Sequence, residues 1–284
     1  MIRLLKLAVL SITLIMVMSA CSSTRISYGF LDDWLQWQID DYITLTTAQQ
    51  SATDSGINDF HRWHRNTQLR QYSAFIDQFI RLAQQQTIDA KDLNPSFDQA
   101  RQLWQQSVSE LLVKNIETLK TLSPKQANTL IDKIEKKQLR NYEDRKSQTP
   151  IARQVKRSQK TIKNIKKWLG SINPAQEQHI EQWLSSLAQT DDARRQRQQD
   201  WNKALRKLLE NPNAGDYSAQ ANRLLVEPQT LWRENYRARF NSNKQLTINM
   251  ITQIHSSMDE QQKRYFINRL NRYKKDFSHL AGTD

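Results

Sequence analysis

The chain has 284 residues, with 42 lysines and arginines against 29 aspartates and glutamates, which gives a net charge of +13 at pH 7. It contains five glycines, six prolines and one cysteine. These counts exclude an internal disulfide, a CxxC metal site and the glycine-rich loops that bind nucleotide phosphates. The scarcity of turn residues also argues against a many-stranded β protein. We therefore expect an all-α fold.

The N-terminal segment has the features of a bacterial lipoprotein signal. Arg3 and Lys6 precede an apolar run from Leu7 to Val17, which is too short to span a bilayer with ease. The sequence Met-Ser-Ala-Cys then ends at Cys21 and resembles a lipobox. The resemblance implies cleavage before Cys21, a diacylglycerol on its thiol and a further chain, such as palmitate, on its amine. Two or more acyl chains anchor a protein stably.

These features divide the chain into three parts. We expect a signal peptide at 1–20, a lipidated cysteine with a short tether at 21–28, and a single all-helical domain at 29–284. The residue after Cys21 is Ser22 and not Asp. In the usual bacterial sorting pattern, the absence of Asp at this position favours the outer membrane over the inner membrane. We therefore expect a body held on the periplasmic face of the outer membrane. The alternative is an ordinary secreted protein with a chance cysteine.

Apolar residues recur with helical spacing along most of the chain. A first segment runs from Phe30 to Tyr42, and a second stripe begins at Ile57 and reaches Leu82. All six prolines occupy positions that suit helix starts or breaks. A helix from Pro228 to Ser256 would be about 43 Å long at 1.5 Å per residue. The pattern predicts an elongated multi-helix bundle.

One local pattern occurs four times. An apolar residue precedes a capping residue, which is followed three positions later by glutamine, as in a capping box. The copies are Leu45-Thr46-x-x-Gln49, Leu122-Ser123-x-x-Gln126, Ile172-Asn173-x-x-Gln176 and Met258-Asp259-x-x-Gln262. The irregular spacing excludes a solenoid repeat. Either this is a recurrent local way to start helices, or a helical hairpin has been duplicated.

The segment after the cysteine carries a family resemblance. Asp-Trp-Leu at 33–35, Asp-Asp-Tyr at 40–42 and Leu-Thr-x-x-Gln at 45–49 resemble an uncharacterised family of proteobacterial lipoproteins. The resemblance implies a helical envelope lipoprotein with no known activity. The Leu-Thr-x-x-Gln box is also similar to that of small helical periplasmic chaperones of the Spy type.

Two groups of residues could suggest catalysis or metal binding. The acids are Asp32, Asp33, Asp40 and Asp41, for which we favour a polar helix face with salt bridges. His61 and His64 are three residues apart and could reach one ion, but their place on an apolar face favours core histidines with hydrogen-bond partners. His179, His255 and His279 stand alone. We expect no metal, no cofactor and no catalytic residue, and hence no enzyme.

The most informative stretch is basic. Residues 145–167 hold nine lysines and arginines and no acid. As a helix, Ile151, Val155, Ile162, Ile165, Trp168 and Leu169 would share one face, with Lys156, Lys160, Lys163 and Lys167 opposite. Such a helix can lie on an anionic membrane, bind an acidic partner, or form a bundle helix with a solvated basic face.

Aromatic residues also gather near the predicted anchor. Tyr28, Phe30, Trp34 and Trp37 either sit among lipid headgroups or pack on a neighbouring helix. The leading hypothesis for the whole chain is a non-catalytic binding, scaffold or chaperone-like lipoprotein that acts on an envelope protein. The alternative is a binder of lipopolysaccharide or acidic phospholipid through helix 151–169. A nucleic-acid partner is not expected outside the cytoplasm.

Overall fold

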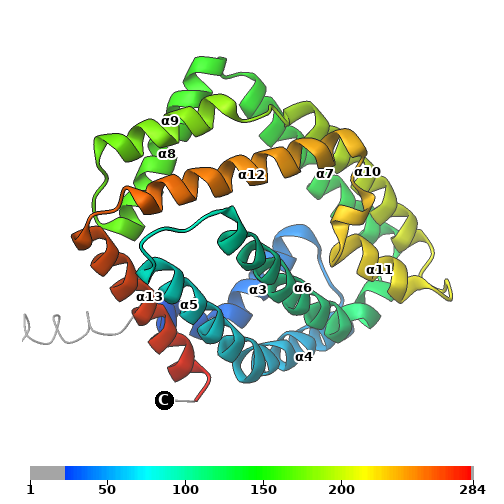
Figure 1. The fold of residues 1–284 in the computed structure, drawn as a ribbon. Helices are drawn as coiled ribbons and strands as arrows, with labels where there is room; N and C mark the ends of the chain where they lie inside the picture. Colours follow the sequence, from blue (N-terminus) through cyan, green and yellow to red (C-terminus); the bar gives the residue numbers. More distant parts are fainter. Residues whose placement is uncertain (1–22, 283–284) are drawn as a thin grey trace, which may run out of the picture.

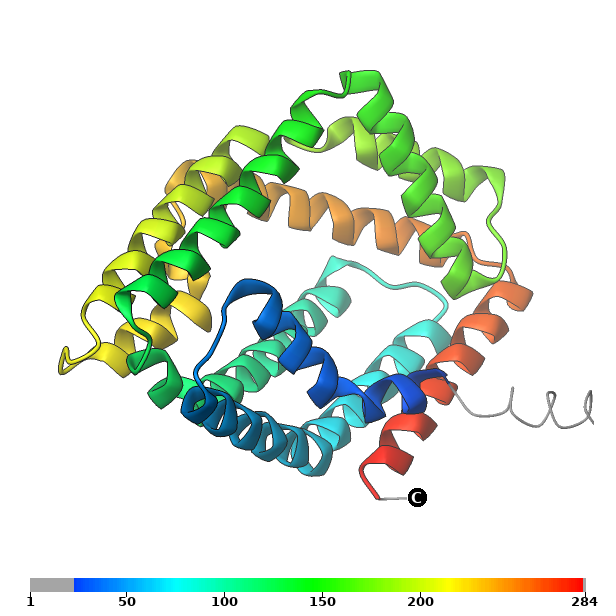
Figure 2. The same cartoon turned by 180° about the vertical axis from the view of Figure 1, so that it is seen from behind.

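A computed structural model describes residues 23–282, and this part of the chain is built from helices and loops without a strand (Figures 1 and 2). The all-α prediction is confirmed. Cys21 and the predicted signal peptide lie outside the described residues. The helices are α2 (Ser23–Gly29), α3 (Leu31–Tyr42), α4 (Thr47–Trp63), α5 (Leu69–Gln84), α6 (Ala90–Lys120), α7 (Pro124–Lys146), α8 (Pro150–Leu169), α9 (Pro174–Ser186), α10 (Asp191–Glu210), α11 (Tyr217–Leu225), α12 (Glu234–Ser256) and α13 (Glu260–Leu280), with a π-helical turn η1 (His64–Gln68) and a 3₁₀ turn η2 (Pro228–Leu231).

The helices pack in pairs around a four-sided frame. α5 lies along α13, α4 along α6 and α7 along α10, while α12 crosses the frame and packs on α9 and α6 (Figures 1 and 2). The apolar side chains form separate small cores. One core joins α6, α7, α10 and α11 around Ile131, Leu208 and Tyr217, and another joins α8, α9, α12 and α13 around Ile180 and Ile254.

Glycine allows close helix contacts at two of these junctions. A Cβ atom on Gly56 of α4 would lie 2.6 Å from the Lys114 carbonyl oxygen of α6, so only glycine permits this crossing. Gly170 ends α8 with φ of +80°, a conformation that L side chains rarely adopt. A Cβ there would also lie 3.1 Å from the Tyr265 ring of α13.

Two helix boundaries differ from the sequence prediction. Pro95 lies inside α6, in its second turn, where it removes the hydrogen bond to the Lys91 carbonyl. The helix expected from Pro228 to Ser256 is divided into η2 and α12, because Trp232 and Arg233 are extended. Arg233 donates two hydrogen bonds of 2.7 and 2.9 Å to Asp200, and this bidentate ion pair stabilises the turn.

All four predicted capping boxes are confirmed. The side chains of Thr46, Ser123, Asn173 and Asp259 accept from the N3 amides, and the glutamines accept from the N-cap amides. These boxes begin α4, α7, α9 and α13, each of which follows the preceding helix after a short loop. A fifth box, formed by Asp89 and Asp92, begins α6 and lacks the glutamine of the sequence pattern.

The glutamines of the four boxes bond to one another across the molecule. Gln49 and Gln126 exchange amide hydrogen bonds, with Nε2 to Oε1 distances of 3.2 and 2.7 Å. Gln176 and Gln262 do the same at 2.9 and 3.0 Å. We call Gln49–Gln126 the first clasp and Gln176–Gln262 the second clasp. The second clasp is buried, with both side chains at most 1% exposed.

Each glutamine also bonds to the loop before its partner's helix. In every case the accepting carbonyl lies two residues before the partner's N-cap. The acceptors are Thr121 for Gln49, Thr44 for Gln126, Ser257 for Gln176 and Ser171 for Gln262. Each amide therefore uses both N–H donors and accepts twice at Oε1, so the clasps leave no polar group of these side chains unsatisfied.

We predict that Gln176→Ala or Gln262→Ala lowers the free energy of unfolding by about 2–3 kcal/mol, because each leaves buried donors and acceptors of the partner unpaired. Urea denaturation measures this loss. The double variant should cost clearly less than the sum of the single variants, since both remove the same bonds. Gln261→Ala, at an exposed neighbouring position of α13, is the matched control and should change stability by less than about 0.5 kcal/mol. Fully additive losses would contradict the clasp.

Candidate functional site

An apolar cleft opens between α5, α8, α12 and α13. Its volume is about 580 Å³, and no lysine, arginine, aspartate or glutamate lines it. The polar side chains in its wall are Thr161, Asn164 and His255. The largest apolar side chains are Phe75, Phe79, Trp168, Met250, Met258 and Phe266. A concave apolar wall of this size is typical of binding sites.

Aromatic side chains at the rim remain partly open to solvent. Phe75 and Phe79 meet edge to face at 5.0 Å on α5, and Trp168 of α8 lies 6.0 Å from Phe266 of α13. Trp168 is 38% exposed. The Arg269 guanidinium lies 5.0 Å from the Trp168 ring centre, and Arg269 does not line the cleft. Two methionines deeper in the cleft give its wall a flexible, polarisable surface.

His255 is the titratable group in the wall of the cleft. Its imidazole is 5% exposed, and neither ring nitrogen has a hydrogen bond of ordinary geometry, although the carbonyls of Leu82 and Ala83 are close. Burial lowers the pKa of His255 below its usual value. The imidazole is therefore neutral at pH 7, and the cleft presents no charge to a guest.

The sequence assigns the residues that line the cleft to separate apolar stripes and does not show that these stripes lie next to each other. Phe75 and Phe79 belong to the stripe that begins at Ile57, and Ile165 and Trp168 belong to the basic helix. The spacing of apolar residues identifies the apolar face of a helix. It does not show which apolar faces are fully covered by neighbouring helices and which leave a cleft between them. The only advance signal was the pair of aromatic residues at spacing i, i+4, which is equally typical of a closed core.

The basic stretch forms α8 as predicted, and its lysines face solvent. Lys156, Lys160, Lys163 and Lys167 are exposed, and none makes an ion pair with a described residue. Other cations of the stretch are neutralised by α10. Arg145 and Arg153 both bind Asp191, at 3.2 and 3.0 Å, and Lys146 binds Asp192 at 2.9 Å.

The apolar face predicted for α8 packs in its C-terminal half alone. Ile162, Ile165 and Leu169 contact the core of α8, α9, α12 and α13. Ile151 and Val155 belong to the same predicted face but are 75% and 50% exposed. The first turns of α8 thus present apolar and cationic side chains together.

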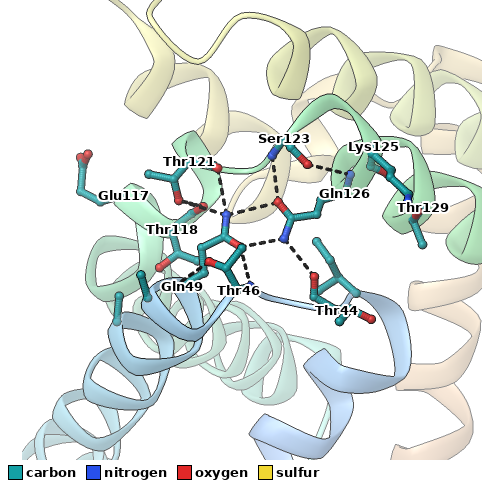
Figure 3. A pocket seen from close by; sticks show the side chains of 13 residues that line it. Thr44, Thr46, Gln49, Glu117, Thr118, Thr121, Ser123, Lys125, Gln126 and Thr129 are labelled. Atoms are coloured by element: carbon teal, nitrogen blue, oxygen red, sulfur yellow. Dashed lines mark hydrogen bonds between the residues drawn. The ribbon is translucent and has the colours of Figure 1, made fainter.

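A polar groove surrounds the first clasp (Figure 3). It has a volume of about 810 Å³ and is lined by hydroxyl and amide side chains such as Thr44, Thr118 and Thr129 around Gln49 and Gln126. The amides of the clasp spend their hydrogen bonds on each other and on the adjoining loops. The groove therefore lies where the first clasp connects the starts of α4 and α7. The two glutamine side chains at its centre have no free polar group that could bind a ligand.

His64 lies in a buried hydrogen-bond chain. Its Nδ1 is 2.9 Å from the Tyr28 hydroxyl and its Nε2 is 3.2 Å from the Tyr72 hydroxyl, which in turn is 3.0 Å from the Ser107 hydroxyl. This confirms that His64 is a core histidine with hydrogen-bond partners. The π-helical turn η1 begins at His64, and both His64 and Gln68 are buried. His61 faces Asp32 at 3.8 Å.

The acidic residues of α3 do not converge on a site. Asp33, Asp40 and Asp41 are exposed, while Asp32 turns toward His61. Within residues 23–282, no three histidine or acidic side chains lie close enough to hold a metal ion. The same part of the chain holds no helix both long and apolar enough to cross a bilayer.

These features define an all-α protein in which pairs of consecutive helices are joined by paired glutamine caps and in which four helices surround an apolar cleft. The chain belongs to a family of unknown function (DUF6279), whose family model matches residues 41–237. The matched segment includes α8 and three of the four glutamine boxes. This confirms the predicted membership of an uncharacterised family, while the lipoprotein character stays a prediction. No curated protein and no solved structure matches the chain.

Protonation of His64 should destabilise the fold. Burial, with a smaller effect of nearby His61, lowers the pKa of His64 from 6.5 to about 4. The unfolded chain therefore binds this proton first, so stability is constant above about pH 6.5 and falls toward pH 4 by about 3 kcal/mol. Urea denaturation across this range measures the fall. It should shrink in His64→Gln and persist in His279→Gln, which alters an exposed imidazole. An unchanged fall in His64→Gln would contradict this assignment.

Proposed function

We propose that this chain is a non-catalytic binding protein that holds apolar segments of envelope proteins in the cleft between α5, α8, α12 and α13. We further propose that acylated Cys21 anchors it to the periplasmic face of the outer membrane. The observation that carries the binding role is the open apolar cleft with aromatic residues at its rim. An envelope scaffold or chaperone needs such a surface.

The chemistry of the wall favours a protein segment over a charged small molecule. A guest with an acidic or basic group would find no counter-charge, because no ionic side chain lines the cleft. Methionine and aromatic side chains adapt to guests of different shape, a property of promiscuous peptide-binding surfaces. The cleft thus suits apolar side chains presented by an unfolded segment.

The same wall supports a non-catalytic role. Thr161, Asn164 and His255 supply its polar groups. A nucleophile must lie within hydrogen-bond reach of a base, and the unbonded ring nitrogens of His255 meet no side-chain hydroxyl or thiol. Binding is therefore the activity that these side chains favour.

We predict that the protein suppresses the aggregation of a model client, reduced α-lactalbumin, and that Phe75→Ser/Phe79→Ser weakens this suppression at least threefold. The two substitutions remove apolar contact area from the rim of the cleft. Light scattering at increasing protein concentration gives the measurement. Trp104→Ser is the matched control, because Trp104 is 68% exposed on α6 and does not line the cleft. Equal suppression by wild type and the double variant would exclude the cleft as the client site.

A second candidate function has its own observation. The unpaired lysines of α8 lie on the opposite face of the helix from the exposed Ile151 and Val155, an amphipathic combination that suits the surface of an anionic membrane or lipopolysaccharide. Each cation near such a surface contributes about 1 kcal/mol.

If α8 binds anionic surfaces, the quadruple change to glutamine at Lys156, Lys160, Lys163 and Lys167 should weaken co-sedimentation with phosphatidylglycerol vesicles by at least tenfold. Binding of the wild type should fall steeply with added salt, since exposed charges are screened within about 8 Å at physiological ionic strength. The control variant changes four exposed lysines elsewhere to glutamine, namely Lys91, Lys125, Lys136 and Lys207. Equal losses in both quadruple variants would indicate a general charge effect and exclude a site on α8.

A further inference from the structure

A row of exposed apolar side chains follows the two N-terminal helices. Ile26, Phe30, Trp34 and Trp37 are 54%, 60%, 53% and 63% exposed. Their spacing of four, four and three residues places them along one side of α2 and α3, and the Trp34 amide bonds to the Phe30 carbonyl across the junction. We call these four residues the aromatic face. Each of these four side chains is more than half exposed, so neighbouring helices cover them only in part, whereas Tyr28 packs against the rings of His61 and His64.

The helices that carry the aromatic face are attached to the body of the protein by their opposite side. Arg25 binds the buried Asp276 of α13 at 2.7 Å, the Tyr28 hydroxyl meets His64, and Asp32 faces His61. These contacts attach the other side of α2 and α3 to α13 and to the α4–η1–α5 helix. The outward direction of the aromatic face is therefore fixed relative to the whole fold.

We propose that the aromatic face is the membrane-docking surface of this chain and that its occupant is a zwitterionic phospholipid bilayer. Ile26 lies five positions after Cys21, and a chain extends at most about 3.5 Å per residue. A lipid on Cys21, which is part of the proposed function, would thus hold the start of the face within about 18 Å of a membrane. Tryptophan and other amphipathic aromatic rings favour the headgroup region.

The charges around the aromatic face select the kind of surface. Asp33, Asp40 and Asp41 are exposed on α3 and make no ion pair with a described side chain. Carboxylates beside the rings would be repelled by an anionic membrane and tolerated by a neutral one. Docking through α3 is therefore chemically distinct from the salt-dependent binding proposed for α8.

Tryptophan quenching by brominated lipid tests the proposal directly. The full-length protein, expressed with its own N-terminus and purified from membranes, is reconstituted into vesicles of phosphatidylcholine with brominated acyl chains. We expect strong quenching relative to unbrominated vesicles, with at least two thirds of it lost in Trp34→Phe/Trp37→Phe and little change at 0.5 M salt. Trp104→Phe, equally exposed but on α6, should keep the quenching of the wild type.

Other outcomes would overturn the proposal. Quenching that is equal in the wild type and the double variant would place the membrane contact elsewhere. Absence of quenching, together with crosslinks between the α3 helices of two chains, would assign the face to a second copy. Mass spectrometry of the same sample reports acylation of Cys21 independently, so failure of the lipid anchor is distinguished from failure of the docking surface.

Discussion

The two glutamine clasps are the constraint on which the arrangement of the helix pairs depends. A side-chain amide has two donors and can accept twice, and each clasp uses this capacity in full between two helix starts and the two loops before them. Such a network is satisfied in one relative position of the joined helices. Any other crossing would leave the glutamine side-chain N–H groups and the loop carbonyls without these partners, which is costly once they are buried.

The repetition of this geometry bears on the origin of the fold. The first clasp joins the consecutive helix pairs α3–α4 and α6–α7, and the second joins α8–α9 and α12–α13. In both, the accepting carbonyl lies at the same offset from the partner's N-cap. A recurrent local way to start helices explains the four boxes but does not explain why their glutamines pair in the same geometry. The pairing therefore favours the other hypothesis, the duplication of a unit of two consecutive helices.

The clasps also stand at the ends of the apolar clefts. Met258, the apolar residue of the fourth box, lines the cleft proposed to bind clients. Leu45 and Leu122, the corresponding residues of the first two boxes, line another apolar cleft of about 640 Å³ between α3, α4, α6 and α7. The polar joints thus lie next to the apolar clefts, one of which is the proposed client site. The attachment of α2 and α3 to the body gives this proposed site a defined orientation to the proposed membrane contact.

The sequence by itself determined the all-α class, the capping boxes and the amphipathic character of α8, because these depend on spacing within a few residues. It also indicated that His64 belongs to the core. It did not show that Gln49 would meet Gln126, since pairing across 77 residues depends on helix crossings that no local pattern encodes. The division before α12 likewise follows from the Arg233–Asp200 pair, which joins distant segments. Only tertiary structure decided which apolar stripes close into cores and which, like those of Phe79 and Trp37, stay open, because burial depends on the face that a neighbouring helix presents.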